Sequence, residues 1–327
     1  MKKIVCFGEA LIDMLAQPPA CEGEPRAFLQ HAGGAPANVA VAVARLGGHA
    51  RFLGMLGEDM FGDFLLESLE AAGVDVSGVV RTDAAKTALA FVALDERGER
   101  SFSFYRPPAA DLLFRPEHFA VDAFADAAVL HACSNSMTEP GVAEATFEGM
   151  RRARASGAVV SFDLNLRPML WPEGIDPTPW LWRALALADV VKLSMEELDF
   201  LAEGVRVPPG GIPGKLWQGL TSLLVVTHGD GPVSWFTRDA SGQVPVFRVP
   251  VLDTTAAGDA FVAGLLHGIA SQWDGQDGLA AFCGQPALID RTLRFASAVG
   301  ALAVTRKGAF AAMPSLEEVQ TLMQEQP

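Results

Sequence analysis

The chain has 327 residues, 39 of them acidic and 25 basic, which gives a formal net charge of -14 at pH 7 and a pI near 4.8. This composition excludes most nucleic-acid binders, which need a basic surface against the phosphates, and it suits an anionic membrane surface poorly. Half of the residues are hydrophobic, so disorder is excluded and a large core is available.

Short strands and helices are predicted to alternate along most of the chain. Apolar runs predict buried strands at 3–7, 50–56, 127–133, 158–163, 188–193 and 222–227. Apolar positions at helical spacing predict helices at 36–46, 61–72, 140–155, 195–203, 258–271 and 285–304. This alternation predicts an α/β fold in which helices cover both faces of a parallel sheet.

Two segments depart from the alternation. Residues 87–106 are predicted to form two strands joined by a charged turn at 95–100, and such a hairpin in a parallel fold typically forms a flap or small lid. Residues 204–215 are rich in Pro and Gly and are predicted to be a loop.

The N-terminal segment and the cysteines bear on the compartment. Glu9 and Asp13 interrupt the first apolar run and no small-residue cleavage site follows, which predicts a buried strand rather than a signal peptide. No stretch of about 18 uncharged apolar residues occurs that could span a membrane. A reducing cytoplasm is predicted because no CxxC pair occurs among the four cysteines, Cys6, Cys21, Cys133 and Cys283.

The most informative segment is DTTAAGDAFVAGLLHG (253–268). Its small residues, Ala256-Ala257-Gly258, lead into a helix-forming run, and the free N–H groups and dipole of a helix start attract an anion. Asp259 falls in the first helical turn, where a carboxylate can accept the proton of a nucleophilic hydroxyl. The same residues fit a packing turn followed by a carboxylate that complements the dipole, and spacing alone leaves both interpretations open.

The segment GGAPANVAVAVARLGG (33–48) is a second candidate. Gly33 and Gly34 permit close backbone approach to a ligand, Pro36 suits a helix start, and Asn38 adds a side chain that both donates and accepts. By itself, the pattern is more typical of a glycine-initiated core helix.

Residues 33–48 and 253–264 resemble the two signature motifs of the ribokinase-like (PfkB) carbohydrate kinase family, in that family's order and separation. The similarity runs from GEALIDML near the start to VTRKGAFAAMP near the end. Within the family, residues 33–48, 99–114 and 161–172 are most similar to fructokinases.

The resemblance implies a three-layer α/β/α fold with a central, mainly parallel sheet. It implies a single kinase domain over residues 1–327, a β-lid formed by about 11–32 and 80–106, and a homodimer formed through that lid. The site is expected at the carboxyl ends of the parallel strands.

The implied activity is Mg-ATP-dependent phosphoryl transfer to the 6-hydroxyl of D-fructose. The catalytic base would be Asp259, and the anion hole would be formed by the N–H groups of Ala256, Ala257 and Gly258, which are the residues that spacing singles out. No GxxxxGK[ST] motif is present, so the phosphates are not expected in a P-loop.

The resemblance also implies a set of sugar-binding residues. Carboxylates, amides and guanidinium groups suit a polyol because they make directional, paired hydrogen bonds. Asp13 could instead form a turn, and Arg106 could be a solvated hairpin end. The implied set is Asp13, Gly33, Gly34, Asn38, Arg106, Asn165 and Arg167, with Asp163 positioning a strand end.

The segment KLSMEEL (192–198) matches the family pattern N-x-x-E, with Ser194 at the Asn position and Glu197 keeping the acid. The implied role of Glu197 is to orient the water shell of the phosphate-bound Mg²⁺. Ser194 and Glu197 equally fit a capping box for the next helix. Ser194 therefore departs from the family at a nucleotide-contact position.

The segment VVTHGDG (225–231) matches the family's nucleotide-binding strand and turn. It is one residue tighter than the usual T-x-G-x-x-G. The implied ATP contacts are Thr227, Gly229, Gly231 and, on a later helix, Ser297.

The segment AVTRKGAF (303–310) resembles the family's monovalent-cation loop, which pairs with Asp253 and Thr255. Backbone carbonyls of Ala303, Arg306 and Gly308 would supply the oxygen ligands of K⁺ beside the anion-hole turn.

Other functions stay open from the sequence. A kinase of this kind could act on 2-keto-3-deoxygluconate, ribose or a nucleoside such as aminoimidazole riboside, and an acid sugar would need Arg106 or Arg167 opposite its carboxylate. A non-catalytic sugar-binding regulator is disfavoured by the intact Asp259 and its turn. A dinucleotide-dependent dehydrogenase is disfavoured because no GxGxxG follows the first strand.

Overall fold

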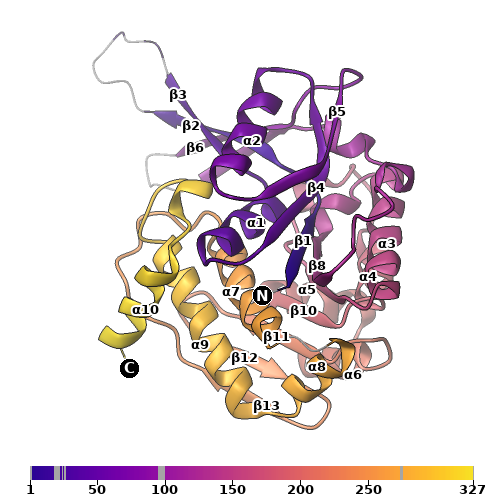
Figure 1. Cartoon of the computed structure of the whole chain (residues 1–327), viewed down its shortest axis with the longest axis vertical. Helices are drawn as coiled ribbons and strands as arrows, with labels where there is room; N and C mark the ends of the chain where they lie inside the picture. Colours follow the sequence, from indigo (N-terminus) through magenta and orange to yellow (C-terminus); the bar gives the residue numbers. More distant parts are fainter. Residues whose placement is uncertain are drawn as a thin grey trace.

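The structure, a computed structural model, describes residues 2–17, 23, 25, 27–94, 100–272 and 275–326. Its main sheet has nine strands in the order β13-β12-β11-β10-β9-β8-β1-β4-β5 (Figure 1). In this spatial order, each strand from β11 across to β5 is parallel to its neighbours. Strand β12 pairs antiparallel with β11, and β13 pairs antiparallel with β12. The strands are β1 (Lys3–Phe7), β4 (Ala50–Gly57), β5 (Asp75–Thr82), β8 (Ala127–Cys133), β9 (Val159–Asp163), β10 (Val190–Ser194), β11 (Leu223–Thr227), β12 (Val233–Phe236) and β13 (Ser241–Val244).

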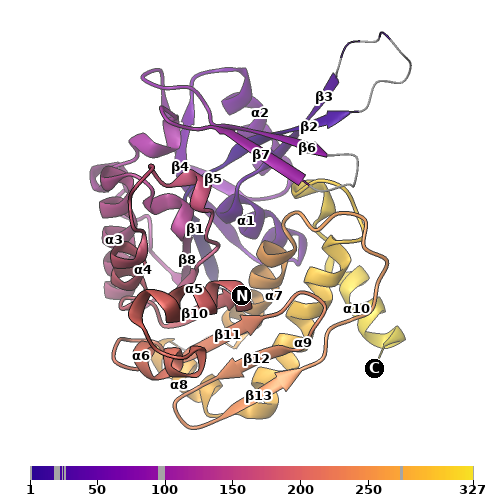
Figure 2. The same cartoon turned by 180° about the vertical axis from the view of Figure 1, so that it is seen from behind.

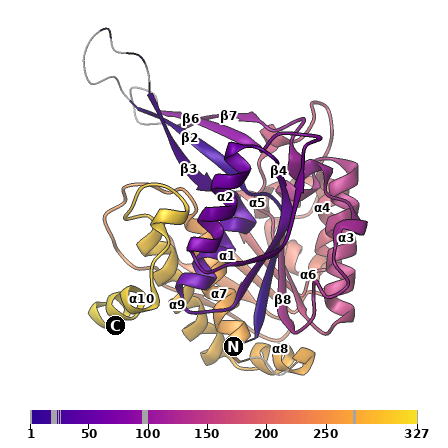
Figure 3. The same cartoon turned by 45° about the horizontal axis from the view of Figure 1, so that its top comes forward.

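Helices cover both faces of this sheet. Side chains of β1 alternate between two cores, with Ile4 and Cys6 on one face and Val5 and Phe7 on the other. The first face is covered by α1, α2 and α7 to α10, and the second by α3 to α6 (Figure 3). These helices are α1 (Ala35–Arg45), α2 (Met60–Ala71), α3 (Pro140–Ala155), α4 (Thr178–Leu185), α5 (Met195–Val205), α6 (Ile212–Leu216), α7 (Ala257–Ser271), α8 (Gly275–Cys283), α9 (Pro286–Ala303) and α10 (Leu316–Glu325).

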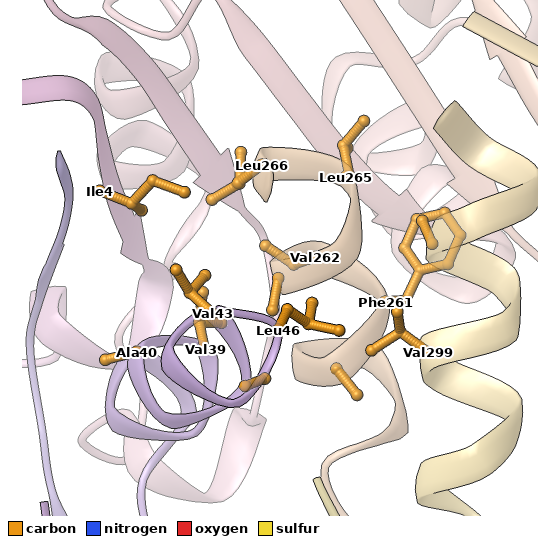
Figure 4. Close-up of a cluster of buried hydrophobic side chains, with 14 of the residues drawn as sticks. Ile4, Val39, Ala40, Val43, Leu46, Phe261, Val262, Leu265, Leu266 and Val299 are labelled. Carbon is orange, nitrogen blue, oxygen red and sulfur yellow. The ribbon is translucent and has the colours of Figure 1, made fainter. Parts of the chain in front are cut away.

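Three helices pack closely behind the two signature segments. In Figure 4, Val39 and Val43 of α1 face α7, and Val299 of α9 lies beside Phe261. A methyl group on the Cα of Gly264 would lie 2.7 Å from the Cα of Ala296, so glycine lets α7 and α9 approach each other. This core holds the first turns of α1 and α7 at the sheet's carboxyl edge.

The predicted three-layer α/β fold is confirmed, but the predicted loop at 204–215 is partly wrong. A short 3₁₀ turn spans Pro209–Gly211, and α6 begins at Ile212. Proline is compatible with both because it lies in the first turn of each, where a backbone N–H has no helical partner. Ile212 and Leu216 are buried and anchor the segment.

A second sheet of four strands, in the order β3-β2-β6-β7, lies at the end of the molecule away from the N-terminus (Figures 1 and 2). The predicted hairpin is confirmed: β6 and β7 are antiparallel, with Leu89 opposite Tyr105. The turn at 95–99 lies outside the described residues, as do residues 18–22, 24 and 26 of the expected lid. The strands are β2 (Leu11–Gln17), β3 (Ala27–Gly33), β6 (Leu89–Leu94) and β7 (Arg100–Tyr105).

One boundary of the expected lid is wrong. Residues 80–82 belong to β5 and pair with β4 in the main sheet, so the lid strands on this side begin at Leu89. That the chain is a single domain stays a prediction.

Two other expectations concern the cysteines and the membrane. Cys6 and Cys133 are buried, free thiols, and Cys283 is also free, whereas Cys21 lies outside the described residues. Among the described helices, none is long and apolar enough to cross a membrane.

Candidate active site

A cavity of about 310 Å³ lies where the second sheet meets the carboxyl edge of the main sheet. Its walls come from the segments that follow β1, β8 and β9, from the first turns of α1 and α7, and from β2 and β7. In the main sheet, β1 lies between β4 and β8, where the strand order reverses, which is where open α/β sheets bind ligands. Topology and cavity therefore agree on the site.

Helix α7 begins at this cavity with an uncapped first turn. Its N-cap residue, Ala256, has a left-handed backbone (φ 57°) and makes no side-chain cap to the turn. The N–H of Ala257 makes a long bond to the carbonyl of Thr254 (3.3 Å). An anion beside Ala256 would meet the positive end of a 15-residue helix.

Asp259 lies in this first turn and lines the cavity although its residue is 8% exposed. Two amides hold its carboxylate: Asn38 Nδ2 donates to Oδ2 (2.7 Å) and Asn165 Nδ2 donates to Oδ1 (3.3 Å). Burial raises the pKa of Asp259, and the Asn38 bond and the charges of Arg167 and Lys192 offset part of that rise. The result is a fixed carboxylate that can accept a proton from a bound hydroxyl.

Lys192, which lies beneath the turn, was not among the expected site residues. Lys192 Nζ is 3.2 Å from Asp163, and a methyl group on the Cα of Gly258 would lie 3.4 Å from that Nζ. Burial alone would lower the pKa of Lys192, but the charges of Asp163, Glu197 and Asp259 outweigh it and raise the pKa. The site therefore holds a buried cation next to the start of α7. Lys192 is the one charged residue of the mostly apolar strand β10, and that was the signal by which the sequence could have indicated it.

The implied sugar residues are only partly brought together. Gly34 takes a left-handed backbone (φ 104°), and a methyl group on its Cα would lie 2.5 Å from the carbonyl oxygen of Glu9. Gly33 and Asp163 do not line the cavity, which among the implied residues is lined by Asp13, Gly34, Asn38, Arg106, Asn165 and Arg167.

Arg106 is buried and largely committed to protein partners. Its Nε and Nη2 donate to Asp111 Oδ2 (2.8 and 2.6 Å), and Nη2 also donates to the carbonyl of Asn135 (2.7 Å). It is therefore not the solvated hairpin end considered above, and its charge is balanced inside the wall.

Two further polar residues of the wall, Glu9 and Asn135, were not expected. Glu9 accepts hydrogen bonds from the N–H of Ala35 (3.3 Å), from Asn135 Nδ2 (3.2 Å) and from the Ser136 hydroxyl (3.2 Å). Both follow buried parallel strands, so their position after β1 and β8 was the signal that could have found them.

Ser194 and Glu197 form the capping box that the sequence allowed. Ser194 Oγ accepts from the Glu197 N–H (3.2 Å), and Glu197 Oε2 accepts from the Ser194 N–H (2.8 Å). Glu197 Oε1 accepts from the Leu166 N–H (2.8 Å). Because both carboxylate oxygens already hold N–H groups, Glu197 suits contact with a metal's water shell better than direct coordination.

The other implied nucleotide residues lie outside the cavity walls. Thr227 ends β11, and its hydroxyl donates to the carbonyl of Leu193 (3.4 Å). The following turn is tight: Gly229 has φ 50°, and the N–H of Gly231 donates to the His228 carbonyl (2.6 Å). Ser297 lies buried on α9, and its Oγ has no partner among the described residues.

The two segments of the implied cation loop lie side by side. The N–H groups of Leu252 and Asp253 donate to the Val304 carbonyl (2.8 and 3.1 Å), and Asp253 accepts from the N–H groups of Thr255 and Gly308 (2.7 and 3.1 Å). The Ala303 carbonyl accepts from the Arg306 N–H (3.4 Å), and the Arg306 side chain pairs with Glu318. Within the described part of the chain, no three His, Cys, Asp or Glu side chains form a metal cluster.

Comparison with known proteins gives one consistent result. The model of the pfkB family carbohydrate kinases matches residues 1–316 of this chain. Fructokinase-1 from Zea mays is 42% identical over 326 residues, which cover 98% of this chain and 97% of that relative.

Two solved structures are also similar. Fructokinase with bound ATP from Xylella fastidiosa is 65% identical, with a TM-score of 0.95 and coverage of 99% of this chain and 98% of that one. Fructokinase from Vibrio cholerae O395, solved in a fructose, ADP and calcium ion bound form, is 34% identical, with a TM-score of 0.86 and coverage of 98% and 99%. The chain therefore belongs to the pfkB family of carbohydrate kinases.

Proposed function

We propose that this chain is an ATP-dependent fructokinase, which transfers the γ-phosphate of ATP to the 6-hydroxyl of D-fructose. The observation that carries the proposal is the carboxylate of Asp259, fixed by two amides between a polar cavity and an uncapped helix start. The similar proteins from Zea mays, Xylella fastidiosa and Vibrio cholerae are named fructokinases, which supports this sugar as the acceptor.

In the proposed mechanism, Asp259 takes the proton of the 6-hydroxyl as its oxygen attacks the γ-phosphorus. The N–H groups at Ala256, Ala257 and Gly258 and the dipole of α7 stabilise the charge on the transferring group. Lys192, buried under Gly258, adds a fixed positive charge on the same side. Positioning and electrostatics suffice, because this reaction needs no covalent intermediate on the protein.

ATP would extend from this turn toward Thr227, Gly229, Gly231, Ser194 and Ser297. Glu197 would hold the water shell of Mg²⁺, and the metal would neutralise phosphate charge. The carbonyls of Ala303, Arg306 and Gly308, together with Asp253 and Thr255, would hold K⁺ beside the anion-hole turn. The donor set is compatible with these ions, since hard cations prefer oxygen ligands and water.

The second sheet would act as a lid over the sugar. It contributes Asp13 and Phe104 to the cavity wall, so its movement would open or close the site. Closure would exclude water and so suppress hydrolysis of ATP. The lid would also form the homodimer, since Phe28, Leu29 and Tyr105 are exposed on it. A cytoplasmic location, expected from the cysteines, stays a prediction.

A coupled ADP-release assay tests the function. The panel is fructose, glucose, ribose, 2-keto-3-deoxygluconate and nucleosides, each with and without K⁺. We expect the highest kcat/KM with fructose. Equal or better turnover of another acceptor would overturn the substrate, and no turnover of any acceptor would favour a non-catalytic sugar-binding protein.

A further inference from the structure

Two asparagine side chains of the cavity wall share an unusual arrangement. Asn38 and Asn135 are 5% and 6% exposed, and both line the cavity. Each commits its Nδ2 to a carboxylate: Asn38 to Asp259 (2.7 Å) and Asn135 to Glu9 (3.2 Å). Each leaves its Oδ1 buried without a hydrogen-bond partner among the described residues.

The carboxylates determine which end of each amide remains free. A carboxylate only accepts hydrogen bonds, so it fixes the NH₂ group against itself and leaves the amide oxygen for another donor. A buried acceptor without a partner is unfavourable, and in a polar cavity a hydroxyl of the ligand can satisfy it. Asn38 belongs to the sugar set already expected, whereas Asn135 does not.

Asn135 is held from two further directions. Its backbone carbonyl accepts from Arg106 Nη2 (2.7 Å), and the next residue, Ser136, donates its hydroxyl to Glu9 (3.2 Å). Glu9 also accepts from the N–H of Ala35 at the start of α1 (3.3 Å). Asn135 is thus held by Glu9 after β1, which α1 in turn holds, and by Arg106 after β7, so its free oxygen is preorganised.

We propose that Asn135 is a sugar-binding residue, whose Oδ1 accepts a hydrogen bond from a hydroxyl other than the one that Asp259 deprotonates, and that Glu9 is the residue that positions its amide. The proposal rests on the proposed function and extends it to substrate selection. A wall that presents Glu9, Asn135 and an Arg106 already paired with Asp111 favours a neutral polyol. On this side of the cavity the carboxylate of an acid sugar would meet acceptors and an arginine that is already paired, so Arg167 is the guanidinium of the lining that would have to bind it.

The first test combines a protein change with a substrate change. Asn135→Leu removes the acceptor at similar volume, and we expect the KM for fructose to rise about 10-fold or more while kcat and the KM for ATP change less than about two-fold. Mono-deoxy fructoses identify the partner hydroxyl, since the analogue that lacks it is a poorer substrate for the wild type but loses no further activity with Asn135→Leu. If every analogue keeps its full penalty in the variant, the contact does not exist.

Thr146→Val is the matched control. Thr146 is buried, and its hydroxyl donates to the carbonyl of Ser136 (2.7 Å), so it touches the same segment without lining the cavity. We expect its sugar KM to stay within about two-fold of the wild type. If Asn135→Leu fails to fold, Asn135→Ser withdraws the acceptor with a smaller change, and the same analogue series decides.

The role of Glu9 is tested by non-additivity. Glu9→Gln should raise the KM for fructose, because its amide no longer fixes the orientation of Asn135. In the Asn135→Leu background, the same change should raise that KM by less than about two-fold. A full additional loss in the double variant would overturn the positioning role. If the wild type prefers another acceptor, the proposed function fails, and the series is then run with deoxy analogues of that acceptor.

Discussion

At the residue scale, the site combines three carboxylates with one buried amine. Asp163, Glu197 and Asp259 each raise the pKa of Lys192, and burial raises the pKa of Asp163 and of Asp259. In a medium of low dielectric constant such charges interact strongly, so their balance depends on every member. We therefore expect a change at any one of these groups to shift the pKa values of the others.

The first prediction concerns the base. Asp259→Asn keeps the size of the side chain and one of its two accepting oxygens, but it cannot take a proton, so we expect kcat to fall about 100- to 10,000-fold. The measurement is ADP release with saturating fructose and ATP, together with the thermal unfolding midpoint, which should stay close to the wild type. Asp199→Asn on the exposed face of α5 is the control. A variant with near-normal activity would show that Asp259 is not the base.

The second prediction concerns the acid limb of the pH profile. Because catalysis needs the ionised form and burial raises the pKa of Asp259, kcat/KM should fall as pH drops through a value above the ordinary aspartate pKa of about 3.9. Arg167 lowers that pKa, so Arg167→Gln should move the limb to higher pH. Arg183→Gln, on the distant helix α4, should leave it in place. A limb that stays fixed or moves to lower pH in Arg167→Gln contradicts the assignment.

Site residues that a local motif marks could be predicted from the sequence, whereas residues that depend on contacts between distant segments could not. Asp259 stands in a small-residue turn, so local spacing alone suggested its chemistry. Lys192, Glu9 and Asn135 owe their position to strands that are distant in sequence and adjacent in the sheet. Their contacts, such as Lys192 with Asp163 and Asn135 with Glu9, form only when β1, β8, β9 and β10 are in register.

At the scale of elements, the buried strands and long helices follow from apolar periodicity, because their side chains face a core on one or both sides. Strand β5 has mostly half-buried side chains, and the short edge strands β12 and β13 pair antiparallel, so neither gave a strong pattern. Helix α6 has only five residues and depends on tertiary contacts of Ile212 and Leu216. Tertiary packing determines these three strands and this helix more than intrinsic secondary-structure propensity does.

The third prediction concerns strand β8, which carries a buried histidine. Burial, and then the charge of Lys192, lower the pKa of His131 to about 3. The unfolded chain takes up this proton near pH 6.5 and the folded chain does not, so stability is lost as pH falls from about 6.5 toward 3. His131→Asn should remove up to about 1.4 kcal/mol per pH unit from the slope of unfolding free energy over that range.

Urea unfolding at several pH values between 5 and 7 measures that slope. Val129→Ala, on the same strand and equally buried, should lower stability at every pH without changing the slope. Equal slopes in the wild type and His131→Asn would mean that His131 does not stay neutral in the fold.

At the scale of the whole molecule, the net charge does not describe the few groups that would face the phosphates. The chain carries -14 overall, yet ATP and the transferring phosphoryl group are anions. The helix start at Ala256, the buried Lys192 and the proposed cations offset this repulsion within a few residues. The net negative charge therefore favours solubility, and it opposes the association of two copies of the chain.

The fourth prediction concerns that association. Phe28 and Tyr105 are 41% and 66% exposed on the second sheet, and both pack edge-on against Phe91 (5.3 and 5.2 Å between ring centroids). Ala16 lies directly opposite Phe28, so a small residue lets the ring reach across β2 toward β6. An aromatic row exposed on a sheet is a typical association surface. We expect a dimer through this face.

Phe28→Lys combined with Tyr105→Lys should convert the dimer to a monomer, measured by light scattering after size exclusion and by sedimentation. Val121→Lys, an exposed apolar residue away from the second sheet, should leave the dimer intact. Since two copies of charge -14 repel each other, the wild-type dimer should also weaken as salt is lowered, because screening is lost. A wild type that is monomeric at all concentrations, or a double variant that still dimerises, would place the interface elsewhere. A dimer that tightens at low salt would mean that opposite charges, rather than aromatic side chains, hold it together.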